Sequence, residues 1–241
     1  MNRRNTLKSG LVLIGSATLA TLLRPVGATS QILPGGRHWA SADTLPPAPV
    51  NPELRLFFDK HEATQVKAIF DRLIPADELS TSASEAGCVV FIDHQLAGDY
   101  GKGRSRFQSK PFVQGTPEQG DQSPLAPADI YRRGLAELDK DCRYRYDKPF
   151  SQLSEDIQDQ YLEQLEAGVI PFSFITSGAF FSLLLGNVRE GFLADPIYGG
   201  NRDMVGWKMI GFPGARYDYR DVVALKGQPL DIQPVSLIGR I

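Results

Sequence analysis

The sequence predicts a mainly α-helical protein with a compact helical core, an irregular, turn-rich C-terminal region and an extended N-terminal leader. Apolar side chains recur at helical spacing over residues 66–74, which indicates an amphipathic helix with one buried face. Residues 172–192 are apolar nearly throughout, which favours a helix at the centre of the core. Residues 191–217 combine glycines, prolines and aromatic side chains, a mixture typical of a packed irregular surface.

The chain begins with a segment typical of an export signal. Residues 1–28 carry basic but no acidic side chains, and an apolar run over residues 10–23 follows Arg3 and Arg4. That run is shorter than the roughly 20 residues of a membrane-spanning helix, and small residues up to Ala28 offer a cleavage site. The adjacent Arg3 and Arg4 indicate the twin-arginine route, which carries folded proteins. A general secretory signal that happens to contain two arginines is the alternative.

A proline-rich leader or linker is predicted for residues 29–52, which show no sustained apolar period. A single helical domain is expected over residues 53–241. Its first helix is predicted to start near Asp59 or Lys60, and Pro75 ends it because proline has no amide hydrogen to continue the ladder.

Three more helices are predicted before the central one. The second covers residues 83–96, and the third begins at Pro127 and runs toward Cys142. The fourth covers residues 153–167. Between the second and third, residues 98–127 are predicted to form a long, exposed excursion, since they are rich in glycine and proline.

Residues 172–192 permit two interpretations, a membrane span or a buried core helix. The uninterrupted apolar part is too short for a span, and polar side chains such as Asn187 and Arg189 interrupt or bound it. We therefore expect a core helix.

Composition and charge exclude several classes of function. Lys and Arg total 26 against 28 Asp and Glu; without residues 1–28, 22 basic and 28 acidic residues remain, a formal charge of −6. An acidic body argues against a nucleic-acid-binding protein, which relies on neutralising phosphates. Three His and two Cys are too few for a Cys-rich metal cluster, and the motif for covalent haem attachment is missing from the sequence.

The two cysteines, Cys88 and Cys142, leave two alternatives open. Export would place them in an oxidising compartment, where a disulfide between them could form and persist. Cys88 lies in an apolar run, so two buried free thiols fit the sequence equally well. The sequence does not give the Cα separation on which a disulfide depends.

The sequence presents no catalytic constellation. His61 and His94 each neighbour an acidic residue, and adjacent residues on a helix point to different sides, so neither pair forms a metal site. Neither a Gly-x-Ser-x-Gly nucleophile motif nor a complete phosphate-binding glycine motif occurs. An exported folded chain without a visible active site points to an accessory subunit.

Several stretches resemble the gluconate 2-dehydrogenase subunit 3 family, the small or gamma subunit of membrane-bound, flavin-dependent gluconate dehydrogenases. The resemblance spans about residues 57–217 and is carried by residues 70–77, residues 85–93, residues 195–203, Trp207 and residues 211–214. The resemblance implies a complex of three chains: a large subunit that contains FAD, a multihaem cytochrome c subunit that contains haem c, and this small subunit.

In such a complex the small subunit itself holds neither cofactor nor catalytic residue, and it supplies the export signal for the flavoprotein. We therefore expect a non-catalytic subunit of a periplasmic complex attached to the cytoplasmic membrane, handled by the twin-arginine translocase and binding no nucleic acid. Residues predicted to dock the flavoprotein lie in the turn-rich tail, together with the leader. They are Asp195, Pro196, Tyr198, Gly199, Gly200, Asn201 and Trp207.

Two other interpretations compete with a docking tail. The first is a free periplasmic enzyme or sugar-binding protein whose site forms only in three dimensions, around Asp195 and Arg202. The second is purely structural: Asp195 starts a turn, Asn201 adopts a left-handed conformation, and Trp207 belongs to the core. The substrate of the complex, whether gluconate, 2-ketogluconate or another polyol or sugar acid, stays open.

Overall fold

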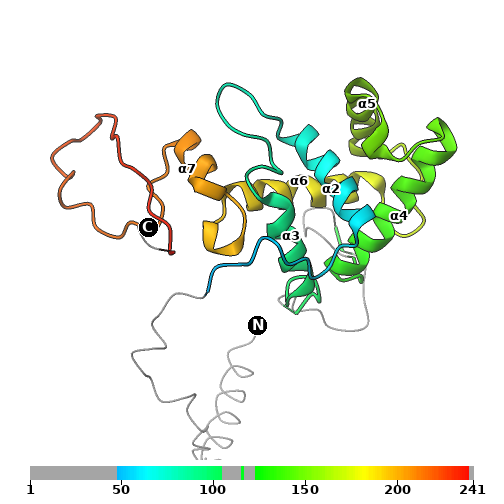
Figure 1. The fold of residues 1–241 in the computed structure, drawn as a ribbon, viewed down its shortest axis with the longest axis horizontal. Coiled ribbons are helices and arrows are strands. Elements are labelled where there is room, and N and C mark those ends of the chain that lie inside the picture. The colour runs from blue at the N-terminus through cyan, green and yellow to red at the C-terminus, as the bar shows by residue number, and fades with distance from the viewer. Residues whose placement is uncertain (1–47, 105–114, 117–122, 239–241) are drawn as a thin grey trace, which may run out of the picture. The chain divides into compact units, whose positions relative to one another are not determined.

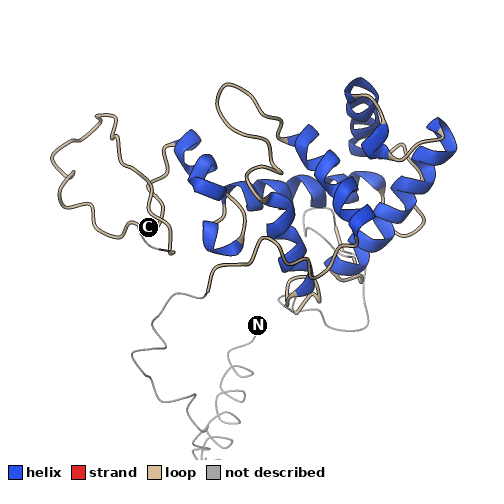
Figure 2. Ribbon diagram, viewed as in Figure 1, coloured by secondary structure: helices blue, strands red, loops and turns tan. Residues whose placement is uncertain are grey.

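The structure is a computed structural model that describes residues 48–104, 115–116 and 123–238. The predictions on Arg3, Arg4, the cleavage site after Ala28 and most of the leader and of the 98–127 excursion lie outside these residues. Figure 2 shows helices and loops, and the described residues contain no strand, so a mainly α fold is confirmed.

Six α-helices and three short 3-10 helices follow one another along the described chain (Figure 1). The α-helices are α2 (Lys60–Leu73), α3 (Cys88–Ala97), α4 (Pro127–Tyr146), α5 (Glu155–Glu166), α6 (Ser177–Leu193) and α7 (Val205–Ile210). The 3-10 helices are η3 (Phe150–Gln152), η4 (Pro196–Tyr198) and η5 (Arg202–Met204). After α7 the chain has no further helix up to the end of the described part.

Helix α2 begins at the predicted residue because a capping box between Asp59 and Glu62 fixes its N-terminus. The Asp59 carboxylate accepts the amide of Glu62 at 2.8 Å, and the Glu62 carboxylate accepts the amide of Asp59 at 3.0 Å. This reciprocal pair satisfies two amides that have no partner within the helix. The predicted apolar stripe is confirmed, since Val66, Ile69 and Phe70 are fully buried.

Two helices start later than predicted. Helix α3 begins at Cys88 instead of residue 83, because Gly87 has φ +85°. This left-handed conformation does not fit into an α-helix, so residues 83–87 form a turn and the helix starts directly after it. Helix α6 begins at Ser177 instead of residue 172, because the Thr176 hydroxyl caps it by accepting the amide of Ala179 at 3.2 Å. The apolar period continues across both boundaries, so pattern alone places the start too early.

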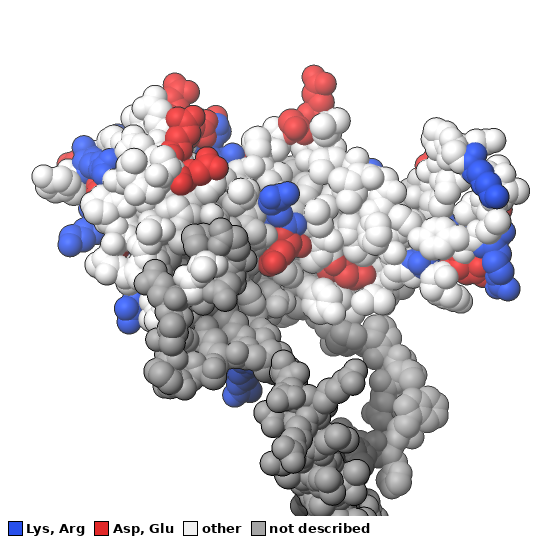
Figure 3. All heavy atoms as spheres, turned by 180° about the vertical axis from the view of Figure 1, so that it is seen from behind, with Lys and Arg blue, Asp and Glu red and all other residues white. Residues whose placement is uncertain are grey.

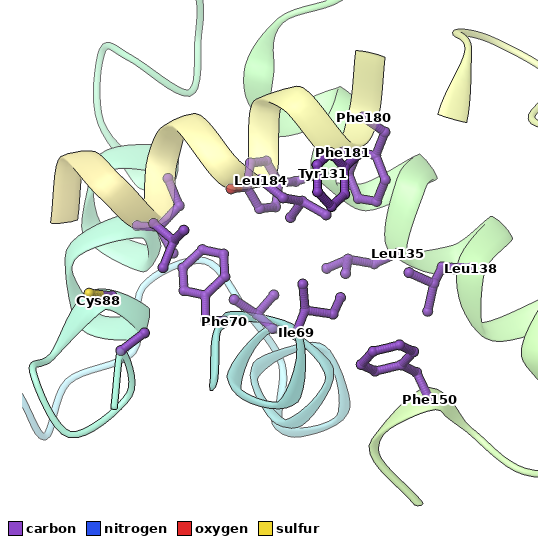
Figure 4. Close-up of a cluster of buried hydrophobic side chains, with 14 of the residues drawn as sticks. Ile69, Phe70, Cys88, Tyr131, Leu135, Leu138, Phe150, Phe180, Phe181 and Leu184 are labelled. Carbon is purple, nitrogen blue, oxygen red and sulfur yellow. The ribbon is translucent and has the colours of Figure 1, made fainter. Parts of the chain in front are cut away.

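Helix α6 lies at the centre of the helical body and contacts α2, α3, α4, α5 and α7. Its prediction as a core helix is confirmed, and no helix of the described residues combines the length and the apolarity needed to cross a bilayer. Figure 4 shows side chains of several helices meeting beneath it. The labelled members of this core are Ile69, Phe70, Cys88, Tyr131, Leu135, Leu138, Phe150, Phe180, Phe181 and Leu184.

A buried amide interrupts the apolar surface of α6 without leaving its polar atoms unpaired. The Asn187 carbonyl oxygen accepts the hydroxyl of Tyr131 at 3.0 Å and that of Tyr100 at 3.1 Å. Its amide donates to Glu190 at 2.9 Å. Burial raises the pKa of Tyr131 well above its usual value, so its hydroxyl stays protonated and donates.

A buried carboxylate holds the segment before α2 against α3. Asp93 accepts the backbone amides of Leu56 at 2.6 Å, Phe57 at 3.1 Å and Phe58 at 2.8 Å. Three donors offset the desolvation of the charge. Nε2 of the next residue, His94, lies 2.9 Å from the carbonyl oxygen of Leu54, so the neighbouring acid and imidazole both bind this segment.

Candidate docking interface

The residues predicted to dock a partner surround a turn after α6, here called the joint (residues 195–201). Its last residue, Asn201, is completely buried and has φ +44°. The side-chain Nδ2 of Asn201 donates to the carbonyl oxygen of Ala194 at 2.8 Å, and its side-chain oxygen accepts the backbone amide of Gly206 at 2.8 Å. The left-handed conformation anticipated for Asn201 is present, and its side chain ties the end of α6 to α7.

Glycines in and around the joint allow backbones to approach one another closely. A Cβ on Gly87 would lie 2.3 Å from the carbonyl oxygen of Gly199, and a Cβ on Gly200 would lie 2.2 Å from that of Gly191. Arg202 then donates its amide to the carbonyl oxygen of Ala86 at 2.9 Å. The joint is therefore packed directly on the turn before α3 and on the last turns of α6.

Asp195 fastens the C-terminal end of the described chain to the joint. One carboxylate oxygen accepts the amide of Ile197 at 3.0 Å and the hydroxyl of Ser236 at 2.8 Å, and the other accepts the amide of Leu237 at 2.8 Å. The N-terminal side reaches the same place, because Val50 donates its amide to the carbonyl oxygen of Ile197 at 3.1 Å. Segments from both ends of the described chain meet at residues 195–197.

Trp207 belongs to the interior of this region. Its indole Nε1 donates to the carbonyl oxygen of Leu193 at 2.7 Å, and its ring packs edge to face on Phe212 with centroids 5.3 Å apart. Gly214 passes so close that a Cβ there would lie 2.6 Å from the indole ring. An indole in this setting contributes buried apolar area and one satisfied donor.

The folded chain therefore leaves few of the predicted docking residues accessible. Gly200, Asn201 and Trp207 are buried, and Asp195, Pro196 and Gly199 are half-buried. Tyr198 alone of the seven is exposed. The burial of Gly200, Asn201 and Trp207 fits the structural interpretation of these three residues, and docking through the other four stays a prediction.

The exposed apolar side chains lie farther along the chain than the sequence analysis placed the interface. Eleven of the sixteen exposed large apolar side chains of the described residues occur from Leu193 onward. They are Leu193, Tyr198, Met209, Ile210, Phe212, Tyr217, Tyr219, Val223, Leu225, Leu230 and Leu237. The signal in the sequence is the cluster of Tyr and aliphatic residues over 217–225, which has no amphipathic helical period to bury it.

A groove of about 670 Å³ lies between residues 52–55, α2 and α3. Its wall includes charged side chains of both signs, namely Glu53, Arg55, Lys67 and Glu85. Asp93, which also lines it, is occupied by the three amides of residues 56–58. In the described part of the chain, no group of three or more His, Cys, Asp or Glu side chains is arranged to hold a metal ion.

Both cysteines are free and buried in the structure. Burial raises the pKa of the Cys88 thiol to about 12, and the carboxylate of Asp71 adds to this effect. Burial likewise raises the pKa of the Cys142 thiol to about 12. At neutral pH both thiols are therefore protonated and poor nucleophiles.

Comparison with known protein families identifies the chain. The family model described as gluconate 2-dehydrogenase subunit 3 matches residues 60–214. The chain belongs to the gluconate 2-dehydrogenase subunit 3 family. Searches of curated proteins and of solved structures gave no match.

The family match begins at the first residue of α2 and ends at Gly214, which lies against the Trp207 ring. In this subunit 3 chain the matched part therefore contains the helical body, the joint and α7. Residues 215–235, most of which are exposed, follow it. The resemblance noted from the sequence is confirmed.

Proposed function

We propose that the chain is the non-catalytic small (gamma) subunit of a periplasmic, membrane-associated gluconate 2-dehydrogenase complex. In this proposal FAD lies in a large dehydrogenase subunit and haem c in a multihaem cytochrome c subunit. The observation that carries the proposal is the family match over residues 60–214, since the family is named as a subunit of that enzyme.

The contacts of the candidate catalytic groups support a structural role. Asp195, the centre of the free-enzyme alternative, already accepts three hydrogen bonds from the chain itself. Asp93 accepts three backbone amides, and His94 binds a backbone carbonyl. A general acid or base needs a free hydrogen-bonding position toward its substrate, and these contacts occupy most of the acceptor capacity of both carboxylates. The free-enzyme and sugar-binding alternatives thus gain no support from the site.

Cofactor content gives a direct test of the non-catalytic role. The chain, expressed without other subunits and purified, is expected to show neither a flavin band nor a haem band in its absorption spectrum. The complex purified through the same chain is expected to show both. A stoichiometric flavin on the isolated chain would contradict the assignment.

Export of the flavoprotein is the second part of the proposal, and it rests on the twin arginines of the signal. Because the twin-arginine route accepts folded cargo, a signal on this chain can carry a flavoprotein that has already bound FAD. Replacing both Arg3 and Arg4 by Lys is expected to retain dehydrogenase activity in the cytoplasmic fraction.

The matched control is Lys8→Arg, which changes a basic residue of the same segment but leaves the arginine pair intact. It should place activity on the periplasmic side of the membrane as the unaltered chain does. Normal export of the dehydrogenase by the Arg3→Lys, Arg4→Lys variant would remove the escort role. Stabilisation is tested in the same strains, because a dehydrogenase that lacks its small subunit is expected to accumulate at a lower level.

A further inference from the structure

We propose that residues 215–235, here called the C-terminal arm, form the surface by which this chain docks on the dehydrogenase subunit. The occupant is an apolar, weakly charged groove on that folded protein. The inference rests on the proposed function, from which it takes the partner, and it adds the location and the chemistry of the contact. The arm follows the last residue of the family match, so the family name does not assign it a role.

Exposure of apolar side chains is the first observation. Tyr217, Tyr219, Val223, Leu225 and Leu230 of the arm are all exposed, and Tyr217 is 96% exposed. Several exposed large apolar side chains within one short segment favour a surface that another molecule covers. Tyrosine is also among the side chains that contribute most to protein interfaces.

The arm is fixed at its base, which is the second observation. Ala215 donates its amide to the carbonyl oxygen of Val235 at 2.6 Å, and Val235 donates its own amide to Pro213 at 3.2 Å. Directly beyond, Asp195 holds Ser236 and Leu237. The two ends of the arm are thus pinned to the joint and to Trp207, while the segment between them is a long loop without helix or strand (Figure 1). Anchored ends reduce the conformational entropy that binding must remove.

Charge decides what kind of partner fits. The arm contains three basic and three acidic residues. Four of them pair within the arm: Arg216 binds Asp221, and Arg220 binds Asp218 at 2.5 Å. Figure 3 shows basic and acidic side chains together on the arm, at the right of that view. A balanced, internally paired set neither attracts phosphate groups nor binds an anionic lipid surface strongly.

Family membership favours a different subunit over a second copy, and the size of the surface is sufficient for either. The arm and the neighbouring exposed side chains of Met209, Ile210 and Phe212 comprise roughly the 20–30 residues that one side of a standard interface contributes. The family name places the chain in an enzyme with other subunits. The buried joint that resembled a docking motif then acts indirectly, because it holds the arm in place.

The experiment compares two double variants matched in residue type and exposure. The arm variant carries Tyr217→Ser and Val223→Ser, at side chains that are 96% and 61% exposed. The control variant carries Tyr144→Ser and Val169→Ser on the helical body, at side chains that are 89% and 65% exposed. Each full-length chain is co-expressed with the other subunits, the complex is purified from detergent-solubilised membranes, and its dissociation on serial dilution is followed by gel filtration.

The arm variant is expected to raise the concentration of half-dissociation by about 30-fold, since interface aromatic residues are frequent hot spots. The control variant is expected to change it less than about 2-fold, as for surface residues outside a contact. Circular dichroism of both variants should match the unaltered chain, because the replaced side chains are exposed.

Three outcomes would overturn one proposal or the other. If the unaltered chain fails to co-purify with a dehydrogenase subunit, the proposed function is wrong. If the complex forms and the arm variant dissociates like the control, the function stands and the arm is not the contact. If the arm variant abolishes only self-association of the isolated chain, the occupant is a second copy, and docking on the dehydrogenase is refuted.

Discussion

Helices α2 to α6 are joined mainly through buried apolar side chains, whereas the region after α6 is joined through hydrogen bonds and close backbone contacts. Fully buried Ile69, Leu138 and Phe180 of the body come from three different helices. In the joint, by contrast, Asn201 binds the backbone of Ala194 and Gly206, and Asp195 binds that of Leu237, far along the chain. Apolar burial is non-directional, while a hydrogen bond depends on distance and angle.

This difference shows how one chain can combine a part that tolerates many substitutions with a part that depends on a few specific residues. The body depends on the amount of apolar surface removed from water, to which many residues contribute. The joint depends on a few positions, each with one geometry. Its function in the fold is to fix a long, exposed segment that has little core of its own.

The largest expected effect is in the body. Replacing Phe180 by Ala leaves a cavity beneath α6, where its ring packs on Tyr131 and Phe172. The free energy of unfolding should fall by about 3–5 kcal/mol in a urea titration. The matched control is Tyr217→Ala on the exposed arm, with an expected change within about 0.5 kcal/mol. A similar loss for both variants would refute the contrast between body and arm.

The next largest change in stability is expected at glycines, where two Gly→Ala variants distinguish a close backbone contact from the conformational freedom of glycine. A Cβ at Gly200 would lie 2.2 Å from the carbonyl oxygen of Gly191, so Gly200→Ala should destabilise by about 1–3 kcal/mol through overpacking. Gly186, within α6, has no atom within 4 Å of such a Cβ. Gly186→Ala should therefore stabilise the protein by about 0.5–1 kcal/mol. Thermal unfolding of both variants measures the two signs, and destabilisation by both would contradict this explanation.

A smaller effect is expected at the carboxylate that fastens the arm. Asp195→Asn keeps one carbonyl oxygen but loses the second acceptor and the charge, so Ser236 or Leu237 loses its partner. The expected loss is about 1–2 kcal/mol of local stability. Limited proteolysis should cut residues 215–235 faster in this variant, with little change in the body. Asp231→Asn, which alters an exposed carboxylate of the arm, is the control and should leave the cutting rate unchanged.

The smallest effect concerns acid stability of the turn before α3. Burial tends to raise the pKa of Asp71, but hydrogen bonds from Lys67 and Ser84 outweigh it, and the folded pKa is lowered. A lowered folded pKa stabilises the protein above the unfolded pKa of about 3.9, and this contribution is lost as pH falls through the folded pKa. From pH 7 to pH 3, Asp71→Asn should therefore lose less stability than the unaltered chain, by under about 1 kcal/mol. If the free energies of unfolding of the variant and the unaltered chain fell in parallel with pH, the Asp71 carboxylate would contribute nothing to the pH dependence of stability.

Much of the helical body could be predicted from local pattern. The period over residues 66–74, the Asp59 start and Pro127 at the first turn of α4 are properties of neighbouring residues, and the structure bears them out. The pattern places the starts of α3 and α6 too early, because the backbone conformation of Gly87 and the cap at Thr176 set these starts within a continuing apolar pattern. The role of Asp93 could not be foreseen, since its partners are more than 30 residues away in sequence.

The sequence by itself determined the fold class, the family and the candidate export signal, because periodicity, composition and short motifs are local properties. Only the tertiary structure decided what the joint does. The sequence leaves open whether Asn201 and Trp207 recognise a partner or serve the fold, and in the folded chain both are buried and bind the backbone of Gly206 and Leu193. Exposure is a property of the whole fold, so only the folded chain showed that residues 215–235 present apolar side chains that the joint does not.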